Sequence, residues 1–120
     1  MSLEIRVKYV ADIEPIKQIE VGDWIDLRAA EDVTMEAGDF KIISLGISMK
    51  LPAGYEAHIV PRSSTYKKWH IIQANHVGII DSSYSGDEDV WGYPAIALTD
   101  TEIHKVQNRK DPAKNQVHSC

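Results

Sequence analysis

Apolar and polar residues alternate through most of this 120-residue sequence, and a period of two is typical of strands that bury one face. At the N-terminus, Leu3, Ile5, Val7 and Tyr9 alternate with charged residues. Short strands at regular spacing predict a mainly β domain, built as an antiparallel sandwich, jelly roll or small barrel. From the same pattern we expect further strands at residues 24–29, 43–51, 55–59, 77–81 and 93–98, and one helix at residues 64–71.

The composition is that of one small globular domain, with 43% hydrophobic and 26% charged residues. A formal net charge of -5 argues against a general affinity for nucleic acid. The only cysteine, Cys120, has no partner for an internal disulfide, which favours a reducing cytoplasm. The first residues lack the apolar segment of a signal peptide, and no apolar run is long enough to cross a membrane, so we expect neither.

The segment Pro61-Arg62-Ser63-Ser64-Thr65 follows an expected strand and leads into the expected helix. A guanidinium beside hydroxyls, at the start of a helix, is a good combination for binding phosphate. The alternative is that Ser63 or Ser64 only caps the helix, because serine is a preferred N-cap residue.

The segment Ala74 to Asp87, ANHVGIIDSSYSGD, carries a carboxylate at the end of an apolar run. We expect residues 77–80 to be buried, and a carboxylate there is costly unless it has partners or a function. Asp81 is therefore a candidate functional residue, with Tyr84 in the turn that follows. The alternative is a hairpin in which Asp81 only forms the turn.

The segment Gly22 to Asp32, GDWIDLRAAED, places Asp26 between Ile25 and Leu27. Asp26 could bind Mg²⁺ directly or through water, since magnesium near phosphates takes carboxylate and water oxygens. It could equally pair with Arg28 or Arg62. The five histidines show no zinc spacing, so we expect surface or hairpin positions for them, and Ser63 has no visible base that would make it a nucleophile.

Together and in this order, the three segments resemble the first three motifs of the dUTP diphosphatase (dUTPase) family. WIDLRA resembles the Asp-Leu segment of the first motif, and PRSST resembles the Pro-Arg-Ser loop of the second. ANHVGIIDSSYSG resembles the hairpin of the third, with its Asn, Gly, Ile-Asp and Tyr-x-Gly. The similarity covers roughly residues 1–105, and its style is similar to the trimeric dUTPases of Gram-positive bacteria and their phages.

The resemblance implies a jelly-roll-like, distorted β-barrel with one short helix, assembled as a homotrimer whose active sites are shared between subunits. The implied reaction is the Mg²⁺-dependent hydrolysis of dUTP to dUMP and pyrophosphate. The implied roles are these: Asp81 activates the attacking water; Tyr84 packs on the deoxyribose; Asn75, Gly78 and Ile80 contact the uracil; Arg62, Ser63 and Ser64 hold the phosphates; Asp26 acts on Mg²⁺ through water.

The resemblance stops near Lys105. Family members continue with a Gly-x-Arg-x-x-Gln strand and a Gly-rich arm, whereas residues 106–120 read VQNRKDPAKNQVHSC. Gln107 and Arg109 stand in the wrong order for the fourth motif, so we assign them no role. We expect a β domain at residues 1–105 and a polar tail at 106–120, and the break predicts a frameshift or truncation near residue 105.

The missing motifs leave three functions open. The first is a dUTPase with activity impaired by its C-terminus. The second is a catalytically weak nucleotide-binding or regulatory protein, such as a prophage dUTPase remnant. The third is a dCTP deaminase-like enzyme of the same fold, from which the segment Ile80-Asp81-x-x-Tyr84 points away.

Overall fold

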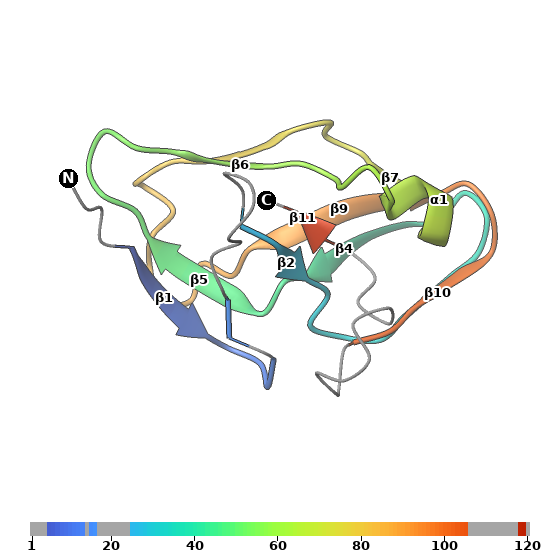
Figure 1. The fold of residues 1–120 in the computed structure, drawn as a ribbon, viewed down its shortest axis with the longest axis horizontal. Helices are drawn as coiled ribbons and strands as arrows, with labels where there is room; N and C mark the ends of the chain where they lie inside the picture. Colours follow the sequence, from blue (N-terminus) through green and yellow to red (C-terminus); the bar gives the residue numbers. More distant parts are fainter. Residues whose placement is uncertain (1–4, 14, 17–24, 106–117, 120) are drawn as a thin grey trace.

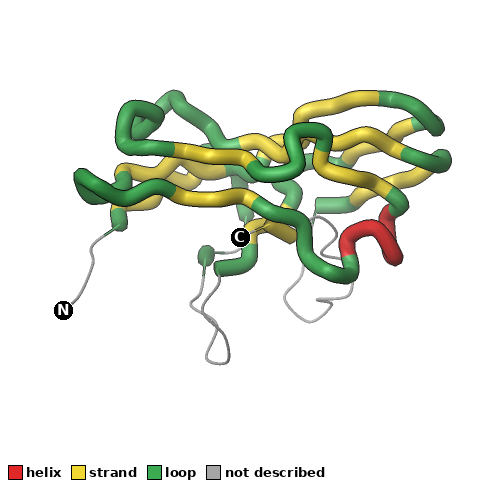
Figure 2. The backbone as a smooth tube through the Cα atoms, turned by 90° about the horizontal axis from the view of Figure 1, so that it is seen from above, coloured by secondary structure: helices red, strands yellow, loops and turns green. Residues whose placement is uncertain are grey.

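The computed structural model describes residues 5–13, 15, 16, 25–105, 118 and 119. This part of the chain is mostly strand, with one short helix at one end of the molecule (Figures 1 and 2). The elements, in chain order, are β1 (Arg6–Tyr9), β2 (Leu27–Arg28), β3 (Val33–Met35), β4 (Phe40–Ser44), β5 (Ile47–Lys50), β6 (Ala57–Ile59), α1 (Thr65–Trp69), β7 (Ile71–Gln73), β8 (Gly78–Ile80), β9 (Gly92–Ala97), β10 (Thr101–Ile103) and β11 (His118–Ser119).

All the strand pairs are antiparallel. The largest sheet has the order β4-β9-β7, and the other pairs are β1-β5, β3-β10, β2-β11 and β6-β8. This jelly-roll-like arrangement of short strands confirms the mainly β fold that the alternation predicts.

In the central sheet, one face of the strands supplies the core. In β9 the burial alternates along the strand, with Tyr93, Ala95 and Ala97 fully enclosed. Ile43 of β4 and Ile71 of β7 lie on the same side of the sheet, since Ile43 is opposite Tyr93 and Ile71 is opposite Ala97. The core is therefore built from the period-two pattern read in the sequence.

The expected strand at residues 43–51 is two strands, because the chain turns a corner between β4 and β5. Gly46 lies at this corner with φ of 70°, in the left-handed region that favours glycine. Trp91 ties both sides of the corner: its carbonyl accepts from the N–H of Leu45, and its N–H donates to Ile47, at 2.9 and 2.8 Å. An alternating pattern cannot reveal such a corner, since the side chains keep the same period on both sides of it.

The helix is shorter than predicted. It ends at Trp69 because His70 adopts a left-handed conformation, with φ of 53°, and its N–H donates to the carbonyl of Tyr66. Ile71 belongs to β7 instead, and the sequence predicted neither β7 nor β3. The described part of the expected strand at 24–29 is regular only at β2.

The ends of the chain differ in how much is described. Residues 1–4, 106–117 and 120 lie outside the described residues, as does Trp24. Within the segment 106–120, residues 118 and 119 form β11, which pairs with β2, whereas the sequence predicted no strand there.

Candidate functional site

The phosphate-binding candidates lie around an ion pair. Nη1 of Arg62, in the loop between β6 and α1, is 2.8 Å from Oδ2 of Asp26, which immediately precedes β2. The Asp26 side chain is only 19% exposed, whereas that of Arg62 is 44% exposed. The pairing of Asp26 with Arg62, which the sequence left open, is thus observed. The less exposed Asp26 carboxylate holds the guanidinium of Arg62 in place at the surface.

The two serines beside Arg62 do not cap the helix with their side chains. Ser64 occupies the N-cap position, but its hydroxyl makes no capping hydrogen bond. The first turn is held by backbone contacts instead, from the N–H of Thr65 to the carbonyl of Arg62 and from the N–H of Lys68 to that of Ser64, each 3.0 Å. Ser64 thus occupies the N-cap position that the capping alternative gave it, but without the capping hydrogen bond of its side chain. Ser63 is exposed and Ser64 half-buried, so both stand beside the Arg62–Asp26 pair.

The hairpin candidates lie on the two-stranded sheet of β6 and β8. Gly78 and Ile80 are opposite Ile59 and Ala57. Asn75 precedes β8, where a tight turn joins the N–H of Val77 to the carbonyl of Asn75 at 2.6 Å. The Oδ1 of Asn75 accepts a hydrogen bond of 2.9 Å from the Nε2 of Gln73, which sequence reasoning did not single out.

Asp81 follows β8 directly and is held by a local turn. The backbone N–H of Ser83 donates to Oδ1 of Asp81 at 2.9 Å, and the Ser83 hydroxyl donates to the same oxygen. These two hydrogen bonds, led by that of the hydroxyl, lower the pKa of the fully exposed Asp81 carboxyl. Ser83 is a second residue missed from the sequence, although an Asp two residues before a Ser is typical of such a turn.

Tyr84 is fixed beside Asp81. Its N–H donates to the carbonyl of Asp81 at 3.2 Å, and its hydroxyl donates to the carbonyl of Val90 at 3.1 Å. Tyr84 remains 42% exposed. Asp81 and Tyr84 are thus presented together at one end of the hairpin.

The prediction that residues 77–80 are buried is wrong for this chain. Val77 is 42% exposed and Ile79 is 64% exposed. The reason is that β6 and β8 form a two-stranded sheet of their own, with a core on one side of it only. Asp81, at the end of this segment, is exposed as well within one chain.

The contacts of the candidate residues thus fall into two groups. Asp26, Arg62, Ser63 and Ser64 gather before β2 and before α1. Asn75, Gly78, Ile80, Asp81 and Tyr84 gather along the β6–β8 hairpin and its turn.

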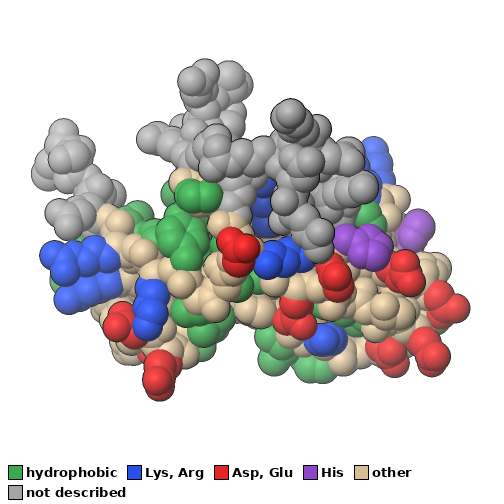
Figure 3. Space-filling model, turned by 90° about the horizontal axis from the view of Figure 1, so that it is seen from below, with side chains coloured by type: hydrophobic (Ala, Val, Ile, Leu, Met, Phe, Trp, Pro, Cys, Tyr) green, Lys and Arg blue, Asp and Glu red, His purple; other side chains and the backbone are tan. Residues whose placement is uncertain are grey.

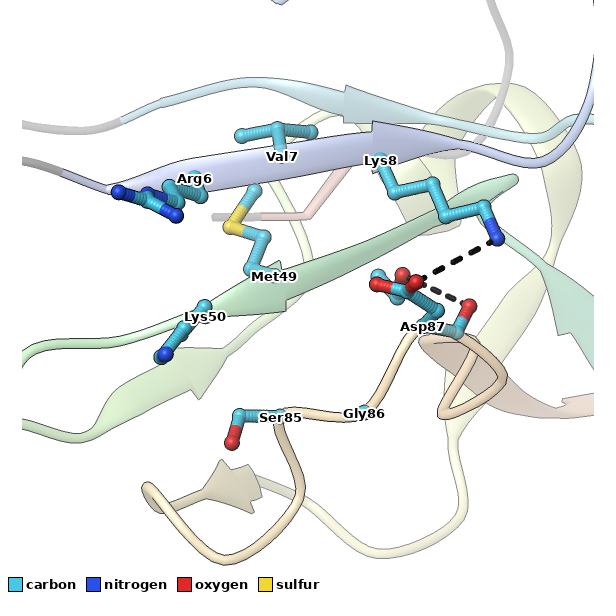
Figure 4. A pocket seen from close by; sticks show the side chains of 9 residues that line it. Arg6, Val7, Lys8, Met49, Lys50, Ser85, Gly86 and Asp87 are labelled. Carbon is cyan, nitrogen blue, oxygen red and sulfur yellow. Dashed lines mark hydrogen bonds and ion pairs between the residues drawn. The ribbon is translucent and has the colours of Figure 1, made fainter.

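A cavity of about 610 Å³ lies next to the same turn, between β1, β5 and residues 85–87 (Figure 4). Its lining includes the cationic side chains of Arg6, Lys8 and Lys50. It also includes Asp87, whose carboxylate is 3.9 Å from the ammonium of Lys8. The buried Ser48 donates its hydroxyl to the carbonyl of Asp87 and so ties the turn to β5. Lys and Arg side chains gather at this end of the molecule (Figure 3).

The described residues offer few side chains that could serve as ligands for a magnesium ion. Within the described ranges, no group of three or more His, Cys, Asp or Glu side chains could hold a metal. The half-buried Asp26 beside the phosphate-binding candidates fits an ion bound through one carboxylate and completed by water and substrate phosphates, which is how Mg²⁺ often binds. His58, His70, His76 and His104 are exposed, as predicted.

The fold and the hairpin define the class of protein. The structure is similar to solved dUTPase chains: that of Streptococcus mutans, with a TM-score of 0.73 and 18% identity, covers 94% of this chain and 90% of its own. The dUTPase of Staphylococcus bacteriophage 80alpha matches with a TM-score of 0.74 and 17% identity, over 97% of this chain and 87% of that one. At these identities the likeness shows the fold, a jelly-roll-like β domain.

The chain belongs to the dUTPase family, whose sequence profile matches residues 10–104. A curated relative, the SPbeta prophage-derived deoxyuridine 5'-triphosphate nucleotidohydrolase YosS of Bacillus subtilis, is 55% identical over 104 residues, which are 86% of this chain and 73% of that protein. The deoxyuridine 5'-triphosphate nucleotidohydrolase of Neisseria meningitidis is 35% identical over 95 residues, 72% of this chain and 63% of the relative. The family resemblance read from the three segments is confirmed. The expected similarity to the dUTPases of Gram-positive bacteria and their phages agrees with the prophage origin of the Bacillus relative.

Proposed function

We propose that this protein is a dUTP diphosphatase, which hydrolyses dUTP to dUMP and pyrophosphate. The observation that carries the proposal is the hairpin of Asp81 and Tyr84, which lies inside the part of the chain that matches the family. Within the described residues no helix is long and apolar enough to cross a membrane. The proposed substrate belongs to the nucleotide pool, so we propose a cytoplasmic location on the ground of the reaction.

Asp81 is the proposed general base. Its carboxylate takes a proton from a water molecule whose oxygen forms a bond to the α-phosphorus, while the bond from that phosphorus to the pyrophosphate oxygen breaks. The lowered pKa keeps Asp81 ionised, and Ser83 holds one carboxylate oxygen so that the other can face the water. The exposure of Asp81 in the single chain means that bound nucleotide and a second subunit must exclude bulk solvent from the site.

Arg62, Ser63 and Ser64 hold the phosphate chain in this proposal. The Asp26 carboxylate keeps the guanidinium of Arg62 in place, and the two hydroxyls supply further donors. Bound Mg²⁺ would neutralise the triphosphate and fix its geometry, with Asp26 as its protein contact through water. The partly buried position of Asp26 supports this role, because its carboxylate is held in one place.

The hairpin reads the nucleoside. Asn75, Gly78 and Ile80 contact the uracil, and the tight turn before β8 leaves little space for a methyl group on the base. Tyr84 packs on the deoxyribose, where a ribose 2′-hydroxyl would clash with its ring. The hydrogen bond from Tyr84 to Val90 supports this assignment, since it holds the ring in position.

A homotrimer is the proposed assembly. One face of the β4-β9-β7 sheet carries apolar side chains without a protein layer over them within the described residues: Phe40 and Ile42 are 59% exposed and Ile72 is 40% exposed. A contiguous apolar face of this kind marks a protein interface. Two groups of site residues in each chain fit active sites completed between subunits.

The direct test is pyrophosphate release from dUTP by the wild-type protein and by Asp81→Asn. We expect release that depends on Mg²⁺ and falls by at least about a hundredfold in Asp81→Asn, because the base is lost. Asp87→Asn is the matched control, since Asp87 is an exposed carboxylate of the same turn region with no proposed role. Equal activity in wild type and Asp81→Asn would refute the role of Asp81.

A second candidate is a nucleotide-binding protein with weak turnover. The observation in its favour is that the family match ends at residue 104, before the segment 106–120. This candidate predicts that dUTP and dUMP bind, as seen by calorimetry, with negligible pyrophosphate release. The family match favours either reading over a dCTP deaminase, which would release ammonia from dCTP.

A further inference from the structure

Gln73 is a polar side chain in an apolar position. It is the last residue of β7 and only 4% exposed, in a strand whose first residue, Ile71, belongs to the core. A buried amide is costly unless its groups are hydrogen-bonded, so its contacts indicate what it does. It makes two hydrogen bonds, both through its Nε2: to the carbonyl of Ile59 on β6 and to Oδ1 of Asn75, each 2.9 Å.

The orientation of the Gln73 amide follows from the chemistry of its partners. The carbonyl of Ile59 can only accept hydrogen bonds, so the group of Gln73 that faces it must be the NH₂. Within the described residues, the buried Oε1 of Gln73 has no hydrogen-bond partner. Rotating the amide by half a turn would place this oxygen against two other oxygens, which makes the observed orientation the stable one.

The Gln73 amide in turn orients Asn75. The second proton of Nε2 points at the Asn75 side chain, so the oxygen of that side chain must face Gln73 and its NH₂ must face away. The Nδ2 of Asn75 lies beside the hairpin backbone: a Cβ added at Gly78 would stand 3.5 Å from it and 3.6 Å from the Nε2 of Gln73. A backbone carbonyl thus determines, through two amides, which group Asn75 presents at the hairpin.

We propose that Gln73 is a positioning residue that makes the enzyme select uracil over cytosine; this rests on the proposed function, in which Asn75 contacts the base. Asn75 presents a donor, the Nδ2 group, and the O4 of uracil is an acceptor. Cytosine carries an amino group at the same position, and two donors that face one another leave both unpaired. A site whose buried polar groups are left unpaired by the wrong ligand discriminates strongly against it.

Two substitutions of Gln73 test in different ways whether Gln73 orients Asn75, an effect that we call the relay. Gln73→Glu keeps the shape of the side chain but offers an acceptor to Asn75, which must then turn its Nδ2 inward and its Oδ1 toward the base. Gln73→Met removes both hydrogen bonds and leaves Asn75 able to adopt either orientation. We expect the ratio of kcat/KM for dUTP to that for dCTP to fall at least about tenfold in both variants, and further in Gln73→Glu.

A purely structural role of Gln73 predicts a different result. Loss of fold would lower kcat/KM for both nucleotides together and leave their ratio unchanged, which would overturn the proposal. Tyr93→Phe is the control, because it also removes a buried polar group without a partner among the described residues, in a core strand. Its ratio should equal that of the wild type.

A binding measurement separates this inference from the proposed reaction. Calorimetry with dUMP and dCMP gives a ratio of dissociation constants that does not require turnover, and the same fall in this ratio is expected. Absence of pyrophosphate release with a changed binding ratio would refute the reaction and support the relay. Normal pyrophosphate release with an unchanged ratio would refute the relay alone.

A measurement on the wild-type protein covers the case in which the variants do not fold. The side-chain NH₂ of Asn75 gives one nitrogen-15 NMR signal, which Asn75→Asp identifies by its loss. We expect dUMP to shift this signal at concentrations at which dCMP does not. An equal response to both nucleotides would overturn the proposal.

Discussion

The chemistry proposed at Asp81 depends on one neighbouring hydroxyl. Ser83 donates twice to the same carboxylate oxygen, once from its backbone and once from its side chain. The backbone bond is a property of the turn, but the side-chain bond, the larger cause of the lowered pKa, can be removed by substitution. Asp81 must be ionised to accept a proton. A donor that lowers its pKa keeps the carboxylate ionised, and able to act as a base, down to a lower pH.

We predict that Ser83→Ala raises the pKa of Asp81 toward its ordinary value. Asp81 would then be protonated at a higher pH, so kcat/KM for dUTP would begin to fall at a higher pH on the acid side of its profile. The pH dependence of pyrophosphate release measures this shift. Ser82→Ala, an exposed serine of the same turn, is the control, and an acid limb that coincides with that of the wild type in Ser83→Ala would contradict the prediction.

Individual residues were predictable where the chain itself places them. Asp81 could be found as a charge at the end of an apolar run, Arg62 as a charge after a strand, and Asp26 as a charge between two apolar residues of an expected strand. The pairing of Arg62 with Asp26 could only be offered as one option, because they are 36 positions apart in the sequence. Ser83 and Gln73 were missed because each acts through a hydrogen bond to another site residue, which no sequence period reports.

Corners between strands control where the elements begin and end. At the corner between β4 and β5, an ideal Cβ on Gly46 would lie 2.7 Å from the Cβ of Ala30 and 3.2 Å from that of Ala11. These neighbours are short side chains attached directly to their backbones, so they cannot move aside. Gly46 therefore meets two demands, a positive φ and a close approach of three chain segments.

We predict that Gly46→Ala lowers the free energy of unfolding by about 2–4 kcal/mol, from backbone strain and overpacking together. Gly38→Ala is the matched control, because Gly38 also has a positive φ, of 90°, but open space around the added Cβ. It should cost only about 1 kcal/mol. Denaturant unfolding at one protein concentration measures both, and equal losses would show that the contact with Ala30 has no effect.

The existence of a strand was easier to predict from the sequence than the residues at which it begins and ends. The sequence identified the segments that became β1, β5, β6, β8 and β9, but only the end of β4, since the expected strand began at residue 43. It missed β3 and β7, which are three residues each, as β6 and β8 also are. The helix was extended into β7 because the apolar residues after His70 fit either element, and only the left-handed conformation of His70 separates them.

The whole molecule has an exposed apolar face that a single chain does not explain. Phe40 and Ile72 both lie opposite Ile96 of the central strand, so these side chains form a row across the β4-β9-β7 sheet. The alternation predicted that one face of each strand is buried, but it could not show that the second face of this sheet is also apolar. This face is the proposed contact between subunits.

We predict that Ile42→Lys breaks the trimer into smaller species and reduces pyrophosphate release in proportion. A charge on this face loses apolar contact and is desolvated in the interface. Analytical ultracentrifugation measures the mass in solution. Tyr55→Lys is the control, since Tyr55 is a similarly exposed apolar residue, 51% exposed, in the turn before β6. An unchanged mass for Ile42→Lys would show that this face is not the interface.

The positions of the cations on β1 have a consequence for how copies of the chain meet. Among the described strands, β1 pairs with β5 alone, so no described strand lies beside its other edge. Arg6 and Lys8 are exposed on β1, and Lys50 lies directly opposite Arg6. When two such edges approach one another, like charges face each other, and exposed charges of this kind prevent open-ended growth into aggregates. Assembly is thereby directed away from the edge and toward a closed, finite complex.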